Sequence, residues 1–389
     1  MRTKPEHQVG ICRTMQSAIA CSVVVALTAI GLSACARADS ASPVPSEPVF
    51  PGASPGPYPV GYAVVTVPAT GSRPSLTVHV WYPSRPSSRS KASYQIIPGV
   101  NVPAHFAVDG AEQLSGRFPL VVYSHGSGAF GVVATYFTEV LASNGYVVAA
   151  PDHPGDTIID AALRIDNTNY QSNVANRIDD LSRVITALTV PTDVTASAVS
   201  RMIEPGKIVV TGHSLGGVAA VGLAASDPRV DMVIAMDPTS ETLTPQQLAQ
   251  VKVPVLMFWS ADGVDESEPQ VYDTMPGPWY QVTLPSAHHD GFTDLCSYEK
   301  LLPTWIPVIQ KADPGLDIQT GLAAFDFPLN CDPPTLSPVR FHDLVDGYSL
   351  SFLEYSLLGN QGWKSTFESS RADASFAKSG ANSGSTSKG

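Results

Sequence analysis

The stretch IVVTGHSLGGVAAVGLAAS, residues 208–226, passes directly from an apolar run into a segment of small residues. Continuous apolar runs of this length are typical of strands that are buried on both faces of a parallel sheet. Gly-His-Ser-Leu-Gly, residues 212–216, lies at the junction. A Gly-x-Ser-x-Gly stretch between a strand and a helix predicts a tight turn that projects its serine, Ser214, from the carboxyl end of the sheet.

The same alternation of strand and helix patterns extends over most of the chain. Short apolar or β-branched runs predict buried strands at 119–123, 146–150, 208–211, 232–236, 255–259 and 281–284. Helical patterns fall at 132–143, 174–188, 215–225, 245–251 and 344–358. An antiparallel pair is expected at 62–67 and 76–82. These patterns predict an α/β fold with a mostly parallel central sheet, helices on both faces and antiparallel strands at the N-terminal edge.

Length and charge limit the classes of function. The chain has 389 residues and a formal net charge of −12, which fits one large domain with additional segments of low order. An acidic surface repels phosphate backbones, so nucleic acid is not an expected partner.

The N-terminus has the pattern of an export signal. Basic residues precede an uncharged apolar run at 18–34, which is short for a membrane span. Leu-Ser-Ala-Cys at 32–35 resembles the bacterial lipobox, in which the cysteine is lipidated and becomes the first residue of the mature chain. We therefore expect a lipoprotein signal at 1–34, lipidation of Cys35, and an exported envelope lipoprotein or secreted protein that meets the membrane through this anchor. An ordinary cleavage site or an uncleaved anchor are the alternatives.

Composition predicts the boundaries of the domain. Residues 35–59 are rich in Pro, Ser and Ala and are expected to form an extended tether, while 369–389 are expected to be disordered. The domain itself is expected at 60–368.

Two cysteines remain after removal of the signal and lipidation of Cys35. In an exported chain, Cys296 and Cys331 predict a disulfide, and two separate buried thiols are the alternative. Both lie in a long segment, about 295–340, that either shapes a substrate pocket or is an inert surface loop.

A serine nucleophile needs a base and an acid that orients it. His288 and His289 follow the last expected strand, and either of them is a candidate for the base. Asp237 ends the strand after the helix that follows Ser214, whereas Asp262 and Asp265 end the next one. The chain order serine, aspartate, histidine holds for all three acids, so position alone does not choose between them.

An oxyanion hole is expected from two loops. Ser-His-Gly-Ser-Gly-Ala-Phe at 124–130 follows a buried strand and precedes a helix, and its glycines let the backbone approach a substrate. We assign the backbone N–H groups of Ser127 and Leu215 as the donor pair.

Together, the motifs at 124–130, 151–153, 212–217, 236–238 and 289–294 resemble the α/β-hydrolases, and within them the platelet-activating-factor acetylhydrolase type, with dienelactone-hydrolase-like, lipase and polyesterase relatives. The likeness runs from about residue 119 to 292. It implies His289 as base, three residues before a Phe-x-Asp, and Asp237 as acid; the lipase and polyesterase pattern would instead match Asp262 or Asp265. It implies no metal or organic cofactor.

The expected function is therefore a serine carboxylic ester hydrolase that acts through an acyl-enzyme on short-chain, phospholipid acetyl or polyester-like esters. Two alternatives remain open. An alcohol in place of water would make the same site an acyltransferase on envelope lipids or sugars. A catalytically inactive hydrolase fold would make the chain a binding lipoprotein.

Overall fold

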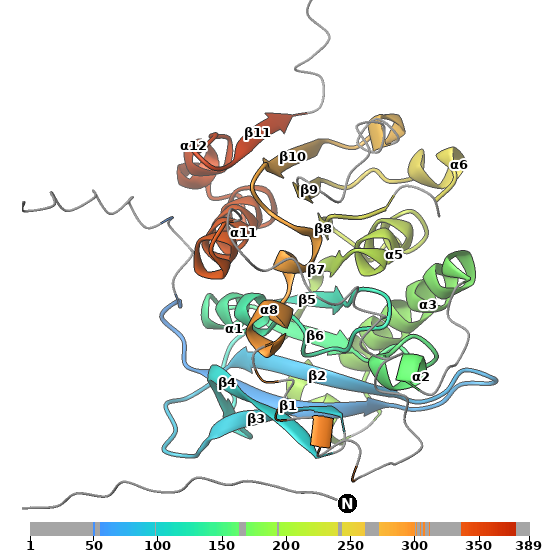
Figure 1. Ribbon diagram of the computed structural model, residues 1–389, viewed down its shortest axis with the longest axis vertical. Coiled ribbons are helices and arrows are strands. Elements are labelled where there is room, and N and C mark those ends of the chain that lie inside the picture. The colour runs from blue at the N-terminus through green and yellow to red at the C-terminus, as the bar shows by residue number, and fades with distance from the viewer. Residues whose placement is uncertain are drawn as a thin grey trace, which may run out of the picture. The chain divides into compact units, whose positions relative to one another are not determined.

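An 11-stranded, mostly parallel sheet forms the centre of the molecule, with helices on both of its faces (Figure 1). The strand order is β11-β10-β9-β8-β7-β5-β6-β2-β1-β4-β3. The computed structural model describes residues 50, 55–97, 99–162, 169–192, 194–239, 243–260, 272–299, 301, 304, 306–307, 311 and 336–378. This architecture confirms the predicted α/β-hydrolase fold, including the antiparallel pairing of the first two strands.

Every strand and helix expected from the sequence is present, with bounds that differ by a few residues. The strands are β1 (Val60–Val67), β2 (Leu76–Pro83), β3 (Lys91–Ile97), β4 (Val100–Asp109), β5 (Phe118–Ser124), β6 (Val147–Pro151), β7 (Ile203–His213), β8 (Met232–Met236), β9 (Val255–Ser260), β10 (Trp279–Leu284) and β11 (Ser375–Lys378). The helices are α1 (Thr135–Ser143), α2 (Ile158–Ala162), α3 (Tyr170–Thr189), α4 (Val194–Ser200), α5 (Leu215–Ala224), α6 (Pro245–Leu248), α8 (Leu295–Glu299), α11 (Pro338–Phe352) and α12 (Lys364–Phe367). Shorter turns are η1 (Tyr272–Thr274), η2 (His289–Phe292), η4 (Gln361–Trp363) and the π-helical η3 (Leu353–Leu357).

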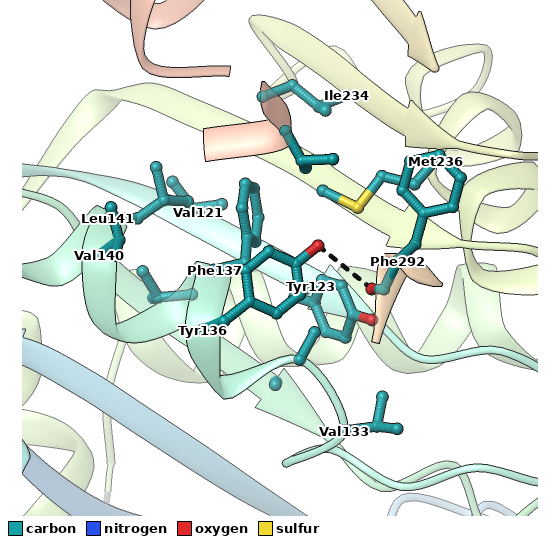
Figure 2. Close-up of a cluster of buried hydrophobic side chains, with 14 of the residues drawn as sticks. Val121, Tyr123, Val133, Tyr136, Phe137, Val140, Leu141, Ile234, Met236 and Phe292 are labelled. Atoms are coloured by element: carbon teal, nitrogen blue, oxygen red, sulfur yellow. Dashed lines mark hydrogen bonds between the residues drawn. The ribbon is translucent and has the colours of Figure 1, made fainter. Parts of the chain in front are cut away.

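The helices divide the apolar core into two layers. Helices α1 and α11 cover one face of the sheet, and α3 and α5 cover the other (Figure 1). In the first layer, Tyr136 and Phe137 of α1 pack beside Met236 of β8 and Phe292 of η2 (Figure 2). The Tyr136 hydroxyl donates to the Phe292 carbonyl at 3.3 Å. This layer therefore holds the segment after β10 against the sheet.

The folded part of the chain begins earlier than the sequence predicted. Phe50, in the expected tether, is 1% exposed, and its ring lies 4.9 Å from that of Tyr348 in α11. Gly56 donates its N–H to the Ser143 hydroxyl at 2.7 Å. The tether prediction is wrong for these residues because a large aromatic side chain finds an apolar site on the domain. The expected signal and Cys35 lie outside the described residues, among which no helix has both the length and the apolar character to cross a bilayer.

The expected disordered tail also begins later than predicted. β11 pairs antiparallel with β10, and Phe376 lies opposite Val282. The Phe376 ring packs 5.2 Å from that of Phe367 in α12. Residues 369–378 are thus part of the fold, because an aromatic side chain and an open strand edge were available to them, while residues 379–389 lie outside the described part of the chain.

A buried carboxylate joins α1 to the β3–β4 hairpin. Glu139 in α1 is fully buried and accepts hydrogen bonds from the Tyr94 hydroxyl at 2.8 Å and from the backbone N–H groups of residues 105–107 at 2.7–3.0 Å. Four donors of this kind compensate for the loss of water around a buried charge. Glu139 therefore fixes the position of the hairpin on the sheet.

We predict that Glu139→Ala lowers the free energy of unfolding by about 3 kcal/mol or more, because three backbone donors lose their acceptor inside the protein. Urea unfolding followed by circular dichroism measures the change. Glu112→Ala is the matched control, since this glutamate belongs to an ion pair with Arg85 whose side chains are 75% and 55% exposed, and its loss should cost less than about 1 kcal/mol. Equal losses in both variants would contradict the structural role of Glu139.

Candidate active site

Ser214 occupies a strained turn between β7 and α5, which we call the elbow. Its backbone has φ 54° and ψ −125°, and it is one of two non-glycine residues with positive φ among the described residues. Side chains other than glycine rarely adopt this conformation, which costs of order 1–3 kcal/mol and persists where neighbouring structure enforces it. The Ser214 N–H donates to the Met236 carbonyl of β8 at 2.8 Å, which holds the turn at the carboxyl edge of the sheet.

The two glycines that flank this turn permit a close approach of three backbone segments. A Cβ atom on Gly216 would lie 2.1 Å from the Ser124 carbonyl oxygen at the end of β5, and one on Gly212 would lie 2.4 Å from the carbonyl carbon of Gly216. Larger residues at either position would therefore push apart β5, β7 and α5. This crowding explains the Gly-x-Ser-x-Gly spacing.

Asp237 and His289 meet at the same edge. The His289 Nδ1 atom lies 2.8 Å from the Asp237 Oδ2 atom. Ser260 at the end of β9 donates its N–H and hydroxyl to the same carboxylate at 2.9 and 2.6 Å. Asp237 is 2% exposed and has a φ of 48°, so the end of β8 is strained as well. The carboxylate accepts a hydrogen bond from Nδ1–H, which fixes the tautomer of the imidazole and leaves Nε2 for other contacts.

His213 lies between the Ser214 turn and the Asp237–His289 pair. It immediately precedes Ser214, and its ring lies 4.4 Å from the ring of His289. Burial, and then the nearby His289 charge, hold the pKa of His213 well below its usual range. A neutral ring therefore lies between the elbow and the partner of Asp237. The predicted nucleophile, base and acid lie at one edge of the sheet.

The turn that carries His289 is anchored on both sides. Phe292 is fully buried and stacks on His213 at 5.9 Å. The Asp294 carboxylate accepts from the Thr135 N–H at 2.5 Å and from its hydroxyl at 2.7 Å. A carboxylate at this position stabilises the N-terminus of α1, which has no cap from its own Ala134. The Phe-x-Asp after His289 thus explains how the histidine is held.

The loop after β5 lies against the elbow. A Cβ atom on Gly126 would lie 3.1 Å from Nδ1 of His213 and 3.5 Å from Cβ of Ser214. Within the described residues, neither the Ser127 N–H nor the Leu215 N–H, the two predicted oxyanion donors, has a hydrogen-bond acceptor. Two backbone donors beside a serine hydroxyl are what a developing oxyanion requires.

A second Ser–His–Asp chain lies behind this loop, and the sequence did not indicate it. The Ser124 hydroxyl lies 2.9 Å from Nε2 of His153, whose Nδ1 lies 3.0 Å from the Asp180 carboxylate. All three residues are at most 2% exposed. Burial, and then the Arg177 charge, hold the pKa of His153 well below its usual range. The hydroxyl-bearing Ser124 is 0% exposed and hydrogen-bonded within the fold, which indicates a structural role for this chain.

Arg177 and Asp156 form a buried ion pair at 2.7 Å beside this second chain, and neither was singled out from the sequence. One feature of the sequence could have pointed to Arg177. Arg177 occupies the apolar face of the helical pattern, at the spacing set by Val174 and Leu181. A charged residue at such a position usually has a buried partner.

The remaining sequence predictions have different outcomes. Asp262, Asp265 and Cys331 lie outside the described residues. Cys296 is disulfide-bonded. No cluster of three or more His, Cys, Asp or Glu residues that could hold a metal ion occurs within the part of the chain that the structure describes.

The neutral buried histidines give a pH prediction. Burial is the main cause that lowers the pKa of His125, His153 and His213, so the folded protein resists protonation that the unfolded chain accepts. Stability is therefore full above about pH 6.5 and is lost as the pH falls below it, by up to about 1.4 kcal/mol per histidine per pH unit. The raised pKa values of His105 and Asp346 offset part of the loss. Urea unfolding at pH 7.5, 6.5 and 5.5 measures the slope, and a flat profile would contradict it.

Comparison with known proteins agrees with this geometry. Residues 96–178 match the family described as platelet-activating factor acetylhydrolase, isoform II. The platelet-activating factor acetylhydrolase of Canis lupus familiaris is 27% identical over 31% of this chain and 35% of its own, so the match spans about a third of that relative.

A solved structure extends the likeness of the fold to most of the chain. The ferulic acid esterase from Streptomyces cinnamoneus superposes with a TM-score of 0.64 and 23% identity, covering 84% of this chain and 98% of the other. The superposition shows that the two chains share a fold, and residues 96–178 are similar to the platelet-activating factor acetylhydrolase family.

Proposed function

We propose that this protein is a serine carboxylic ester hydrolase. The observation that carries the proposal is the 2.8 Å contact between Asp237 and Nδ1 of His289 beside the strained turn of Ser214. A serine hydroxyl is a weak nucleophile until a base takes its proton, and a base works best when a buried acid fixes its tautomer and stabilises its charged form. The three residues have the types and the chain order that this chemistry requires.

The reaction proceeds in two halves. The Ser214 hydroxyl attacks the ester carbonyl while Nε2 of His289 takes its proton, and the Asp237 carboxylate stabilises the resulting imidazolium. The imidazolium returns the proton to the departing alcohol as the acyl-enzyme forms. Water then attacks the acyl group, gives a proton to His289, and releases the carboxylic acid and the serine hydroxyl.

The negative charge on the carbonyl oxygen is stabilised by the backbone. We assign the Ser127 and Leu215 N–H groups as the donors to this charge, and α5 adds the positive end of its dipole, since its first residue is Leu215. Removal of one such donor typically costs about 10²–10³-fold in kcat.

Short acyl esters are the substrate class that we propose. The relative from Canis lupus familiaris is named for the hydrolysis of an acetyl group, and the superposed structure is named for esters of ferulic acid. Both names describe esters of a carboxylic acid, the bond that the arrangement at Ser214 can cleave.

Single substitutions test the proposal on p-nitrophenyl acetate. Ser214→Ala and His289→Ala should each lower kcat by about 10⁴-fold or more, because the nucleophile or its base is lost, and Asp237→Asn should lower it by about 10²–10⁴-fold, because the imidazole loses its orientation. Initial rates at saturating ester measure these losses. Full activity of Ser214→Ala would refute the proposal.

His288→Ala is the matched control for His289→Ala. His288 is the adjacent imidazole, whereas the 2.8 Å contact with the Asp237 carboxylate belongs to Nδ1 of His289. Its substitution should change kcat by less than about fivefold. A larger loss for His288→Ala than for His289→Ala would transfer the role of base to the neighbour.

We also propose that the enzyme is exported and held at the cell envelope by lipid on Cys35. The apolar run and the Leu-Ser-Ala-Cys ending at residue 35 support this. Export is consistent with a disulfide at Cys296, whose proposed partner is Cys331, the one other cysteine that follows Cys35 in the chain.

Cys35→Ser in the full chain tests the anchor. The variant should move from the detergent-extracted membrane fraction to the soluble fraction in a bacterial host, because the acyl chains that hold it have no attachment site. Quantitative immunoblotting of the two fractions measures the change. A serine variant that still fractionates with membranes would refute the lipid anchor and favour an uncleaved apolar segment.

A further inference from the structure

Arg177 uses all of its donors beneath the loop that follows β5. Its Nε and Nη2 atoms donate to the Asp156 Oδ2 atom at 3.0 and 2.7 Å. Nη1 donates to the Ser124 hydroxyl at 3.2 Å and to the His125 carbonyl, and Nη2 also donates to the Gly126 carbonyl at 3.1 Å. A guanidinium has five N–H groups, so each of them has a partner here. The side chain is 1% exposed, and its geometry is therefore fully determined by these contacts.

Asp156 extends the same contacts along the loop. Its Oδ1 atom accepts from the Ser127 hydroxyl at 2.9 Å and from the Gly128 N–H at 3.0 Å. With the carbonyls of His125 and Gly126 held by Arg177, one buried ion pair contacts four consecutive residues, 125–128. A buried ion pair repays its desolvation only when hydrogen bonds surround it, as they do here.

These contacts decide where one backbone donor points. Gly126 and Ser127 share a peptide group, and the C=O and N–H of a trans peptide point to opposite sides. The guanidinium holds the Gly126 carbonyl together with Nδ1 of His125 at 2.7 Å and the Ala129 N–H at 3.2 Å. The Ser127 N–H therefore points away from the guanidinium. A flip of this peptide would direct the N–H toward a positive charge.

We propose that Arg177, paired with Asp156, is a positioning residue for the reaction: it fixes the Ser127 N–H in the orientation that binds the oxyanion. The inference rests on the proposed function, because the N–H acts only if Ser214 attacks a carbonyl. It explains why a charged residue occupies the apolar face of α3 and is paired with a carboxylate beside the loop. Arg177 acts through the loop and does not contact the substrate.

Lysine cannot replace this arginine. An ammonium group keeps the charge but has three donors and no planar fork, so it cannot hold two carbonyls, a hydroxyl and a carboxylate together. Arg177→Lys therefore keeps the buried charge and removes the geometry. Arg229→Lys is the matched control. Arg229 pairs with Asp227 at 2.5 Å and donates to the Ser182 hydroxyl of α3, the helix that also carries Arg177. None of these residues belongs to the loop after β5.

The experiment compares wild type, Arg177→Lys and Arg229→Lys on p-nitrophenyl acetate and on the thionoester in which sulfur replaces the carbonyl oxygen. Rates are normalised to the amount of active sites from the p-nitrophenol burst, which corrects for unfolded protein. For Arg177→Lys we expect kcat on the oxygen ester to fall by about 10–100-fold, with KM changed by less than about threefold. Backbone donors bind an oxyanion better than a thiolate-like sulfur, so the preference for oxygen over sulfur should fall by a similar factor.

Ser127→Ala provides a second variant if Arg177→Lys does not fold. It removes the hydroxyl contact with Asp156 and keeps the N–H itself, so the same loss of oxygen preference is expected at a smaller size, about 3–10-fold in kcat. Equal losses on both substrates would overturn the inference, because they indicate general damage to the fold. So would an Arg177→Lys variant whose kcat equals that of Arg229→Lys.

The two proposals fail in different ways. A folded wild-type protein that hydrolyses no ester through Ser214 overturns the proposed function, and the positioning role with it. A wild type that hydrolyses esters, with a Ser214→Ala variant that does not, keeps the proposed function whatever the result for Arg177. The kcat of Arg177→Lys relative to Arg229→Lys and the oxygen-to-sulfur comparison then decide the positioning role.

Discussion

The close packing of three backbone segments at the elbow is the constraint on which the site depends. Gly216 and Gly212 let the end of β5 lie against the start of α5, next to Ser214, whose φ is 54°. The same contact brings the loop after β5 beside the serine. The strained turn of Ser214 and the loop that carries the Ser127 N–H therefore lie beside the same packing contact. Asp237, which also has a positive φ, receives its position from the neighbouring strand, where Ser260 holds its carboxylate.

The molecule holds a second set of Ser, His and Asp residues besides the proposed catalytic one, so residue types and contact distances do not by themselves define a catalytic site. Ser124, His153 and Asp180 are linked by contacts of 2.9 and 3.0 Å, yet their side chains are buried beneath the loop. Arg177 donates to the Ser124 hydroxyl, which leaves the hydroxyl proton for His153 and fixes the neutral ring. His289, by contrast, has a side chain that is 34% exposed. Access to solvent and backbone strain distinguish the two sets.

Most of the fold could be predicted because its strands are buried on both faces. β8 has the predicted bounds, 232–236, since all five residues are apolar. The β3–β4 hairpin was not predicted: its residues alternate between buried and exposed, and Pro103 lies within β4. Pro205 and Gly206 likewise concealed the start of β7.

In the site, Ser214 followed from local spacing, whereas the choice of Asp237 and His289 required the family resemblance. The role of Arg177 could not be predicted from local spacing or from the family resemblance. Its contacts with the loop join residues that are 51 and 52 positions apart in the sequence. Phe50 is a similar case. A single aromatic residue in a proline-rich segment carries no periodic pattern, and its burial depends on the space that Gly347 leaves on α11.

The short last strand has a consequence for how molecules of this protein meet one another. Without β11, β10 would present a row of unpaired amide and carbonyl groups at the rim of the sheet, a template onto which a second copy can add. Four residues near the C-terminus occupy that rim, and Lys378 places a charge where the pairing ends. The edge of the sheet is thus a strand of only four residues that ends in a lysine, and both features disfavour pairing with the edge of another sheet.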